Sequence, residues 1–322
     1  MRPTTARWPR ARRGLPAGWT SVAILFAAMF SIALAAPPPV AAQQDFSQVE
    51  VKAEAVAPGV WMVTGAGGNI GVSAGEDGVL LVDDQYAPLT DKIRAAVAGI
   101  SERPIRFVLN THWHSDHTGG NENLGQAGVL IVAHENVRER MSVEQFIAHL
   151  DRKIPPSPEA ALPVVTFTDA VTLHLNGDEI HAFHVPPGHT DGDSIIHFRK
   201  ANVLHMGDLF FHGRYPFIDL SSGGSARGVL DAAGRALELA DAETRIIPGH
   251  GALSDRAGLE AYRDMLAAVI GRVEALLAEG KTLEEVQAAK PSAAHDATWS
   301  SGTGWITPEV FVATVYESLK GD

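Results

Sequence analysis

Four side chains that could bind a metal lie within six consecutive positions of this 322-residue chain. Residues 112 to 117 read His-Trp-His-Ser-Asp-His, which supplies the three imidazoles of His112, His114 and His117 and the carboxylate of Asp116. Imidazole nitrogen and carboxylate oxygen are ligands that catalytic zinc accepts. The chain contains no cysteine, which excludes thiolate ligands and disulfides. The motif therefore predicts a metal site built from histidine and carboxylate groups.

This short motif does not complete a metal site by itself. Alternate residues of an extended segment point the same way, so His112 and His114 are expected to reach one metal together. Asp116 and His117 follow the turn and face a neighbouring position. Because a catalytic zinc has three protein ligands and keeps a position for water, four ligands are too many for one such metal and too few for two. Further ligands must come from elsewhere in the chain.

Three more candidates follow a glycine at the end of a predicted strand. They are His189 in Pro-Gly-His-Thr, Asp208 in Met-Gly-Asp and His250 in Pro-Gly-His-Gly. A preceding glycine permits a backbone turn that aims the next side chain out of the sheet edge. Taken alone, His189 or His250 in a glycine-rich turn would more often be a capping or surface residue than a ligand, and Asp208 could be a helix or turn cap. Together with the motif, they give seven ligands for two metals.

The hydrophobic pattern predicts the elements that must position these side chains. Strands are expected at residues 60–64, 70–74, 79–82, 105–109, 129–133, 171–175, 180–185, 195–198, 203–206 and 246–247. Helices are expected at residues 88–100, 119–124, 136–151, 230–239, 256–277, 283–289 and 308–319. Strand-rich segments followed by helices occur twice, which indicates two sheet layers with helices packed outside. The metal motif follows the strand 105–109 directly, where loops carry chemistry in layered α/β folds.

The first 42 residues have the pattern of an export signal. Five arginines precede an apolar stretch from Val22 to Ala36, and the small residues Val40-Ala41-Ala42 form a cleavage site before Gln43. The apolar stretch is too short for a good membrane span. Sec export is the safer expectation, although Arg12-Arg13 leaves a twin-arginine route open. We expect cleavage after residue 42, no stable membrane insertion afterwards, and a single domain of residues 43–322 that is periplasmic or secreted.

The charge of the mature chain disfavours nucleic acid as a partner. Removing five arginines and no acidic residues changes the net charge from −12 to −17. Nucleic-acid binding depends on basic surface that displaces counterions from phosphates, and no cluster of basic residues remains to provide it. A small-molecule substrate is therefore expected.

The order of the motif 112–117, then His189, Asp208 and His250, resembles the metallo-β-lactamase superfamily over essentially the whole mature region. The resemblance implies an α/β fold, a four-layer αβ/βα sandwich of two mixed β-sheets flanked by helices, with two metals at one edge of the sheets. It also implies the distribution of the ligands. The first metal would take His112, His114 and His189, and the second would take Asp116, His117 and His250.

The resemblance further implies that Asp208 bridges the two metals. It also implies that Asp83 does not bind a metal itself but holds one of the ligands in place by a hydrogen bond. Two cations about 3.5 to 4 Å apart would hold a bridging hydroxide and polarise a carbonyl, so no serine or cysteine nucleophile is needed. Asp116 is the catalytic residue expected to orient that hydroxide. Zinc is expected from the ligand types, and iron and manganese are alternatives.

The substrate is less defined by the sequence. The resemblance favours a hydrolase of a small cyclic amide or ester, with weak β-lactamase activity as a side reaction. Cysteine-bearing zinc β-lactamases have lysine at the position of Phe211, which disfavours efficient β-lactam hydrolysis by this chain. Lactone-cleaving members typically have tyrosine there, which this chain also lacks. A thioesterase of the glyoxalase II type is the main alternative, although the C-terminal helices lack a basic glutathione-binding cluster. A nuclease or a non-catalytic metal-binding protein is less favoured.

The loop that follows Asp208 supplies the candidates for substrate contacts. Aromatic groups beside a metal site suit an apolar substrate, and an arginine can bind a carboxylate with two hydrogen bonds. The candidates are Phe210, Phe211, His212, Arg214 and Tyr215. Packing of the rings against the body of the protein, and solvation of the arginine, explain the same residues equally well.

Overall fold

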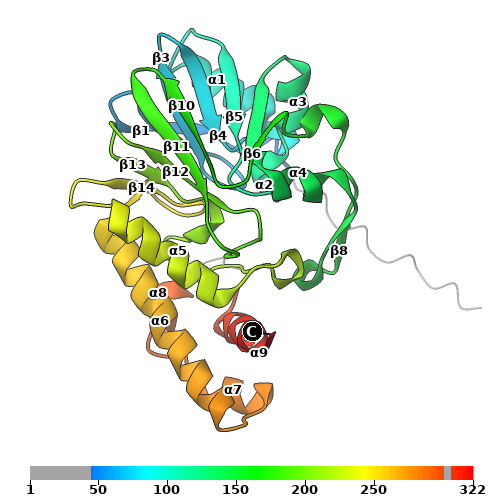
Figure 1. The fold of residues 1–322 in the computed structure, drawn as a ribbon, viewed down its shortest axis with the longest axis vertical. Coiled ribbons are helices and arrows are strands. Elements are labelled where there is room, and N and C mark those ends of the chain that lie inside the picture. The colour runs from blue at the N-terminus through cyan, green and yellow to red at the C-terminus, as the bar shows by residue number, and fades with distance from the viewer. Residues whose placement is uncertain (1–44, 301–305, 322) are drawn as a thin grey trace, which may run out of the picture. The chain divides into compact units, whose positions relative to one another are not determined.

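Two β-sheets form the centre of the chain in the computed structural model, which describes residues 45–300 and 306–321 (Figure 1). The expected signal segment, residues 1–42, lies outside the described residues. Residues Asp45–Asp322 group into one unit by their internal contacts. Within the described ranges, no helix has the length and apolarity that a membrane span needs.

The first sheet combines an antiparallel meander with parallel strands. Its order in the described chain is β1 (Lys52–Ala57), β2 (Val60–Thr64), β3 (Ile70–Gly75), β4 (Gly78–Val82), β5 (Ile105–Leu109), β6 (Leu130–His134) and β9 (Val165–Phe167). Strands β1 to β4 are antiparallel neighbours, whereas β5, β6 and β9 join in parallel. All five residues of β4 are buried, as expected of a strand covered on both faces.

The second sheet begins with three antiparallel pairings. Its order is β10 (Ala170–Leu175), β11 (Asp178–His184), β12 (Ser194–Phe198), β13 (Val203–His205), β14 (Arg245–Ile247) and β15 (Ser254–Asp255). Strands β13 and β14 are parallel, and the helix α5 (Ala226–Leu239) lies in the crossover between them. The prediction of two mixed sheets is confirmed.

Apolar side chains hold the layers together. One buried cluster joins Leu80 and Leu109 of the first sheet to Ile196 and Phe198 of the second, so the sheets pack face to face. Helix α1 (Thr90–Ala98) packs on the outer face of the first sheet through Ile93 and Val97, which belong to a separate cluster. The domain is therefore a helix–sheet–sheet–helix sandwich, which confirms the expected fold class.

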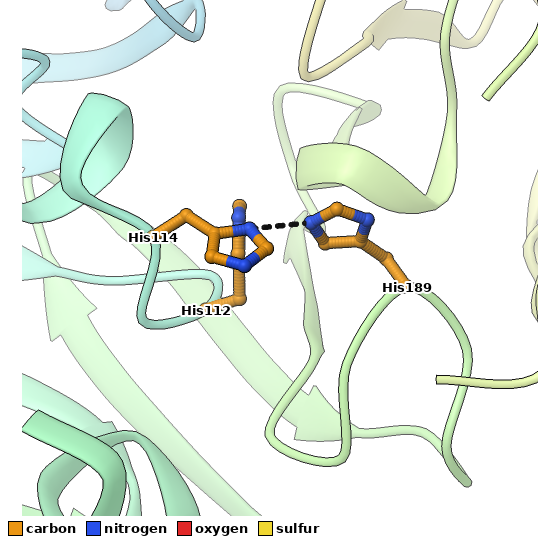
Figure 2. A group of neighbouring side chains, drawn as sticks. All are labelled: His112, His114 and His189. Carbon is orange, nitrogen blue, oxygen red and sulfur yellow. Dashed lines mark hydrogen bonds between the residues drawn. The ribbon is translucent and has the colours of Figure 1, made fainter. Parts of the chain in front are cut away.

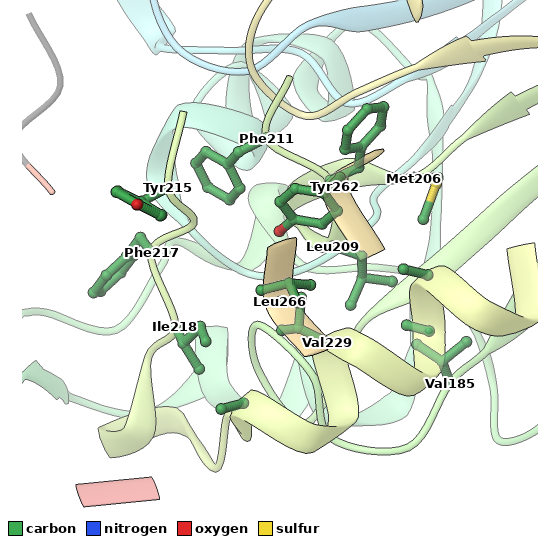
Figure 3. Packing of buried hydrophobic residues seen from close by; sticks show 14 of the residues in the cluster. Val185, Met206, Leu209, Phe211, Tyr215, Phe217, Ile218, Val229, Tyr262 and Leu266 are labelled. Carbon is green, nitrogen blue, oxygen red and sulfur yellow. The ribbon is translucent and has the colours of Figure 1, made fainter. Parts of the chain in front are cut away.

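The second sheet is covered by α5 and by α6 (Arg256–Ala278). The other C-terminal helices pack against these helices and one another, and Figure 1 shows the first of them at the end of α6 that lies away from the sheets; they are α7 (Leu283–Ala289), α8 (Asp296–Trp299) and α9 (Pro308–Gly321). Side chains cap the starts of the longer helices, since Ser225 accepts from the Gly228 N–H at α5 and Asp255 from the Gly258 N–H at α6. Figure 3 shows part of the apolar cluster beneath these helices, to which Leu209, Val229 and Leu266 belong.

The helix expected over residues 136–151 is wrong in its second half. Helix α4 spans Glu135–Ser142, and the chain then forms a hairpin of β7 (Gln145–Ile147) and β8 (Arg152–Ile154). Val143 has extended backbone angles that end the helix. The Arg140 guanidinium then donates to Gln145 Oε1, and the Gln145 amide donates to the Arg140 carbonyl, which ties the hairpin to the end of α4.

The other expected elements are present with ends that differ by a few residues. Strand β9 was not predicted and has three residues. The elements without a sequence prediction are short or at an edge: α2 (Ser115–Thr118), α8, β1 and β15. α3 (Asn121–Gln126) carries the chain from β5 to β6.

Candidate metal centre

The fold brings all seven candidate ligands together at one edge of the paired sheets. The motif 112–117 follows β5, His189 lies in the loop between β11 and β12, and Asp208 and His250 follow β13 and β14. Three groups have ligand atoms that all lie within 4.8 Å of one another: His112, His114 and His189; His112, His117 and Asp208; and Asp116, His117 and His250. Residues separated by more than 130 positions thus converge on one site.

The first group is formed by three imidazoles that face each other (Figure 2). His114 Nδ1 lies 2.8 Å from His189 Nε2. His112 Nε2 is buried and has no hydrogen-bond partner in the described structure. These nitrogens surround a common point at which a cation would find three lone pairs.

The second group contains one carboxylate and two imidazoles. Asp116 Oδ2 lies 3.6 Å from His117 Nε2 and 3.3 Å from His250 Nε2. The two ring nitrogens lie 3.4 Å apart. Asp116 and His250 keep 22% and 19% of their side chains exposed, whereas the other candidate ligands are nearly covered, so solvent reaches the site from this side.

Asp208 lies between the groups and turns a different oxygen toward each. Its Oδ2 is 3.5 Å from His189 Nε2 and 3.9 Å from His112 Nε2. Its Oδ1 is 3.1 Å from His117 Nε2 and 3.3 Å from His250 Nε2. This is the arrangement required of a carboxylate shared by two cations.

Two glycines permit this position of Asp208. Gly207 adopts a left-handed backbone with φ of +49°, which turns the chain at the end of β13. A Cβ atom on Gly249 would collide with Asp208 Oδ1, so the close approach of the two loops requires glycine there.

The donor set fits a pair of divalent cations of the kind that the fold family implies. A buried ring nitrogen without a partner is costly unless a further group binds it, and His112 Nε2 is such an atom. Histidine and aspartate without cysteine suit zinc and also iron or manganese. In metal sites the outer nitrogen of each imidazole is normally held by a hydrogen bond, and this holds for four of the five histidines here.

Asp83 supports one histidine from each group. Its Oδ2 accepts from His117 Nδ1 at 2.8 Å and from the Thr111 hydroxyl at 2.8 Å. The Thr111 hydroxyl oxygen lies 3.0 Å from His112 Nδ1, and the Thr111 N–H donates to Asp83 Oδ1 at 2.8 Å. Asp83 is buried at the end of β4 with a left-handed φ of +63°, which is strained for a residue with a side chain. The structure thus places it behind the ligands, where the sequence predicted it.

Asp219 is a site residue that the sequence did not indicate. Its Oδ2 accepts from His114 Nε2 at 3.0 Å, which turns His114 Nδ1 toward His189. The Ser222 hydroxyl donates to the same carboxylate, and the Ser221 hydroxyl donates to its other oxygen. Asp219 follows no strand and no glycine. The only local signal was the Asp-Leu-Ser-Ser sequence, which is typical of an aspartate that binds the hydroxyls and N–H groups just after it.

Burial and charge give the two groups different protonation in the metal-free chain. Burial lowers the pKa of His189 to about 4 and that of His112 well below its usual value, so both rings are neutral. Burial also opposes charge on His250, but Asp208 and Asp116 outweigh it and raise the pKa of His250 to about 9. The neutral imidazoles of His112 and His189 have lone pairs available for a cation.

The aromatic residues of the loop after Asp208 fall into two sets: rings that pack in the core and rings that lie beside the candidate ligands. Phe210 is buried against Tyr262, with ring centroids 5.0 Å apart. The Tyr215 hydroxyl donates to Asp296, and its ring stacks on Phe311. Both side chains point into the core, so their packing accounts for them without a ligand.

Two other rings, Phe211 and Phe217, border the metal groups, and both are labelled in Figure 3. Phe211 stacks on His250 with centroids 5.1 Å apart. Phe217, which also lies in this loop, is 5.9 Å from the His114 ring and 5.5 Å from the His189 ring. His212 Nδ1 lies 2.8 Å from the Ala252 carbonyl, and Arg214 is exposed. Phe211 and Phe217 are therefore the rings of this loop that lie against the ligands.

Comparisons with curated proteins find relatives of low identity. The chain is 24% identical over 204 residues to the acyl-coenzyme A thioesterase MBLAC2 of Bos taurus, covering 59% of this chain and 72% of the relative. It is 25% identical over 158 residues to the 2,4-dinitroanisole O-demethylase subunit alpha of a Nocardioides species, covering 48% and 44%. It is 27% identical over 109 residues to the hydroxyacylglutathione hydrolase of Erythrobacter litoralis, covering 33% and 35%. The last two alignments span less than half of either protein.

Solved structures share the fold at still lower identity. A metallo-beta-lactamase from Pontibacter korlensis aligns with a TM-score of 0.56 and 18% identity, covering 67% of this chain and 99% of that one. The DIM-1 metallo-beta-lactamase aligns with a TM-score of 0.55 and 19% identity, covering 68% and 99%. Residues 63–250, more than half of the chain and containing all seven candidate ligands, match the model of the metallo-beta-lactamase superfamily. The protein therefore belongs to this superfamily of metal-dependent hydrolases.

Proposed function

We propose that the chain is a two-metal hydrolase that cleaves a carbonyl ester or amide bond of a small molecule. The observation that carries the proposal is the position of Asp208, because its two oxygens face two separate groups of imidazoles. A single-metal site would not need a carboxylate shared in this way. The sequence favoured a cyclic amide or ester, and this remains our first candidate substrate class.

The proposed metal ligands follow the two groups. His112, His114 and His189 would hold one cation, Asp116, His117 and His250 the other, and Asp208 would contact both. When bound, such cations polarise a carbonyl and lower the pKa of water enough for it to act as a nucleophile near neutral pH. Zinc is our first choice, with iron and manganese as alternatives.

Asp116 has the position of a residue that orients the attacking water. It is the most exposed of the candidate ligands, and it lies beside His117 and His250 on the side from which solvent enters. Burial alone would raise the pKa of Asp116, but His117 and the hydrogen bond with His250 outweigh it and hold the pKa below its usual value. The carboxylate is therefore ionised and accepts a hydrogen bond from water in the direction of the substrate.

A thioesterase is the second candidate function. It is favoured by two relatives, which are named as an acyl-coenzyme A thioesterase and a hydroxyacylglutathione hydrolase. The cations that would polarise an ester carbonyl, and the water that would attack it, would act on a thioester carbonyl in the same way. The leaving group then separates the candidates, since an alkoxide needs more stabilisation than a thiolate.

The experiment that tests this proposal combines metal content with a substrate panel. Metal per chain is measured in the purified mature protein, followed by hydrolysis of a chromogenic β-lactam, a lactone, a thioester and a phosphodiester. We expect two metals per chain and turnover of the lactone or the thioester, with weak or no turnover of the β-lactam. Two bound metals per chain without turnover of any ester, thioester or amide would contradict the assignment of the protein as a carbonyl hydrolase. Turnover of the phosphodiester alone would favour a nuclease instead.

We also propose that residues 1–42 direct export and that residues 43–322 act as one domain in the periplasm or outside the cell. The support is the order of arginines, apolar residues and small residues in the sequence. The prediction is an N-terminus at Gln43 in protein recovered from the periplasm or medium. The prediction would be contradicted if N-terminal sequencing found Met1 as the first residue of a protein that is active in the cytoplasm.

A further inference from the structure

Three hydrogen bonds join Asn69, in the loop between β2 and β3, to the residues on either side of His250. The Asn69 side-chain amide donates to the Pro248 carbonyl and to the Gly251 carbonyl, both at 2.9 Å. The Asn69 main-chain N–H donates to the Gly249 carbonyl at 2.7 Å. A loop of the first sheet therefore holds the chain before and after a candidate ligand that follows the second sheet.

The side chain of Asn69 is well suited to this contact. An amide NH₂ group has two donors, and here each of them is used by one carbonyl. Only 5% of Asn69 is exposed, so the amide is occupied by the loop and closed to a substrate. Without this amide the buried Pro248 carbonyl would lose its donor, which favours movement of the loop toward water.

Asn69 is also connected to the turn that carries Asp208. The Asn69 carbonyl oxygen lies 3.1 Å from His205 Nε2. His205 Nδ1 accepts from the Gly207 N–H at 3.2 Å, so the ring carries its proton on Nε2 and donates it to Asn69. The turn before Asp208 is therefore fixed to the same residue as the loop of His250.

Gly68, the residue before Asn69, contacts the other two ligands of the second group. The Gly68 N–H donates to the Asp116 carbonyl at 3.1 Å. A Cβ atom on Gly68 would collide with the His117 ring, so the backbone lies directly against this imidazole. The Gln85 side-chain amide donates to the Gly68 carbonyl at 2.6 Å and holds the segment in place. Gly68 and Asn69 together thus reach each ligand of the second group, directly or through its neighbours in the chain.

The first group is supported by other residues. The outer nitrogens of its three histidines are held by the Asp219 carboxylate, the Phe217 carbonyl and the Thr111 hydroxyl. A change at Asn69 is therefore expected to act on the second group before the first.

We propose that Asn69 is a positioning residue for the second cation, the one that Asp116, His117 and His250 would hold. It keeps the His250 imidazole within reach of the other two ligands by fixing the main chain on both sides of that ring. The inference rests on the proposed function, which requires two cations, and adds that the affinity for the second cation depends on Asn69. A ligand on a loop that is free to move binds a metal more weakly, because its position must be ordered first.

The test is a zinc titration of the metal-free mature protein and of Asn69→Ala, in competition with a chromogenic chelator. The variant His250→Ala lacks one ligand and so identifies which of the two dissociation constants belongs to the second cation. Thermal melts check that the variants fold. If Asn69→Ala does not fold, Asn69→Ser, which keeps one shorter donor, replaces it.

The matched control is Asn176→Gly. Asn176 also joins the two sheets through its side-chain amide, which donates to the Gly78 carbonyl at 3.0 Å and to the Ser73 hydroxyl at 3.1 Å. It lies beside the other end of β3 from Asn69, and glycine accepts its left-handed φ of +54°. The control therefore removes a similar contact between the sheets away from the metal centre.

We expect the dissociation constant of the second zinc ion to rise by about 10–100-fold in Asn69→Ala, while that of the first changes by less than about threefold. At limiting zinc the variant should lose turnover, and excess zinc should restore kcat, because Asn69 does not contact the substrate. Asn176→Gly should bind both ions as the unmodified protein does. Equal weakening of both ions, no weakening, or a loss of kcat that zinc does not restore would overturn the proposal.

Two outcomes separate this inference from the proposed function. If Asn69→Ala weakens only the second ion but the unmodified protein turns over no substrate, the positioning role stands and the hydrolase assignment fails. If the unmodified protein binds fewer than two zinc ions, the two-metal function fails, and NMR of the histidine rings in metal-free protein decides the role of Asn69. A His250 signal that shifts or broadens in Asn69→Ala and not in Asn176→Gly supports that role, and an unchanged His250 signal overturns it.

Discussion

The proposal of two cations rests on the carboxylate of Asp208. One of its oxygens faces His112 and His189, and the other faces His117 and His250. Behind the ligands, Asp83 and Asp219 hold the outer nitrogens of His117 and His114. The centre therefore depends on carboxylates in two layers, one toward the cations and one toward the rings.

Replacing Asp116 should separate metal binding from turnover. The variant Asp116→Ala is expected to lose at least about 100-fold in kcat, because the carboxylate that orients the attacking water is absent. The first group does not include Asp116, so the variant should keep about one metal per chain. Metal analysis and steady-state kinetics on the same sample check both statements. Full activity of this variant would remove Asp116 from the catalytic role.

Replacing Asp219 should weaken metal binding without touching a ligand. Asp219→Ala frees the His114 ring to rotate, and loss of such an outer hydrogen bond typically costs about 10–100-fold in metal affinity. Competition with a chromogenic chelator measures this affinity. The matched control is Asp264→Ala, an exposed aspartate on α6. Equal affinities for both variants would show that Asp219 does not position His114.

The sequence predicted the seven ligands and, through the resemblance, Asp83, but it did not indicate Asp219. His189, Asp208 and His250 were visible because each follows a glycine at a strand end, which is a local pattern. Asp219 acts through the fold of its loop, and no local pattern distinguishes it from a turn residue. The sequence grouped Phe210 and Tyr215 with Phe211 as candidates for substrate contacts. It could not separate them, because the packing of a loop side chain depends on which face of the loop meets the core.

At the scale of elements, the β7–β8 hairpin shows how periodicity can mislead. Phe146 and Leu150 stand four positions apart, as on one face of a helix, and this spacing predicted a helix through residue 151. Both side chains are exposed, so no core face exists to stabilise that helix. Strand β4 and helix α6 were predicted well because their apolar residues are mostly buried, from end to end in β4 and from Leu259 to Val273 in α6.

The ion pair of Arg140 with Asp191 should control the mobility of the hairpin. In Arg140→Ala the base of the hairpin loses its contacts to the His189 loop and to Gln145. Trypsin is then expected to cut after Arg152 or Lys153 about fivefold faster, which corresponds to about 1 kcal/mol of easier local opening. Mass spectrometry of timed digests locates the cuts. Arg199→Ala, which breaks an exposed pair with Glu179, is the control and should leave that rate as it is.

At the scale of the molecule, the two sheets were predictable because a strand-rich half followed by helices occurs twice. The strand order was not, since pairing of β6 with β9 and of β13 with β14 depends on contacts between distant segments. The same long-range contacts create the metal centre, which joins loops from both sheets.

Removing the metals should therefore destabilise the whole domain. Cations that bind only the folded chain stabilise it by mass action, by about 2.7 kcal/mol at a free concentration one hundred times Kd. A chelator is expected to lower Tm by several degrees, and added zinc should restore it. Differential scanning calorimetry at constant protein concentration checks this. An identical Tm with and without chelator would indicate that the folded chain holds no metal.

The central claim is that two cations share Asp208. Anomalous X-ray diffraction from crystals of the metal-loaded mature protein, collected at the absorption edge of the bound metal, tests it most directly. The prediction is two anomalous peaks about 3.5 to 4 Å apart, one beside His112, His114 and His189 and the other beside Asp116, His117 and His250. Asp208 should contact both. A single peak at full metal loading, or two peaks with Asp208 bound to only one, would contradict the two-metal account.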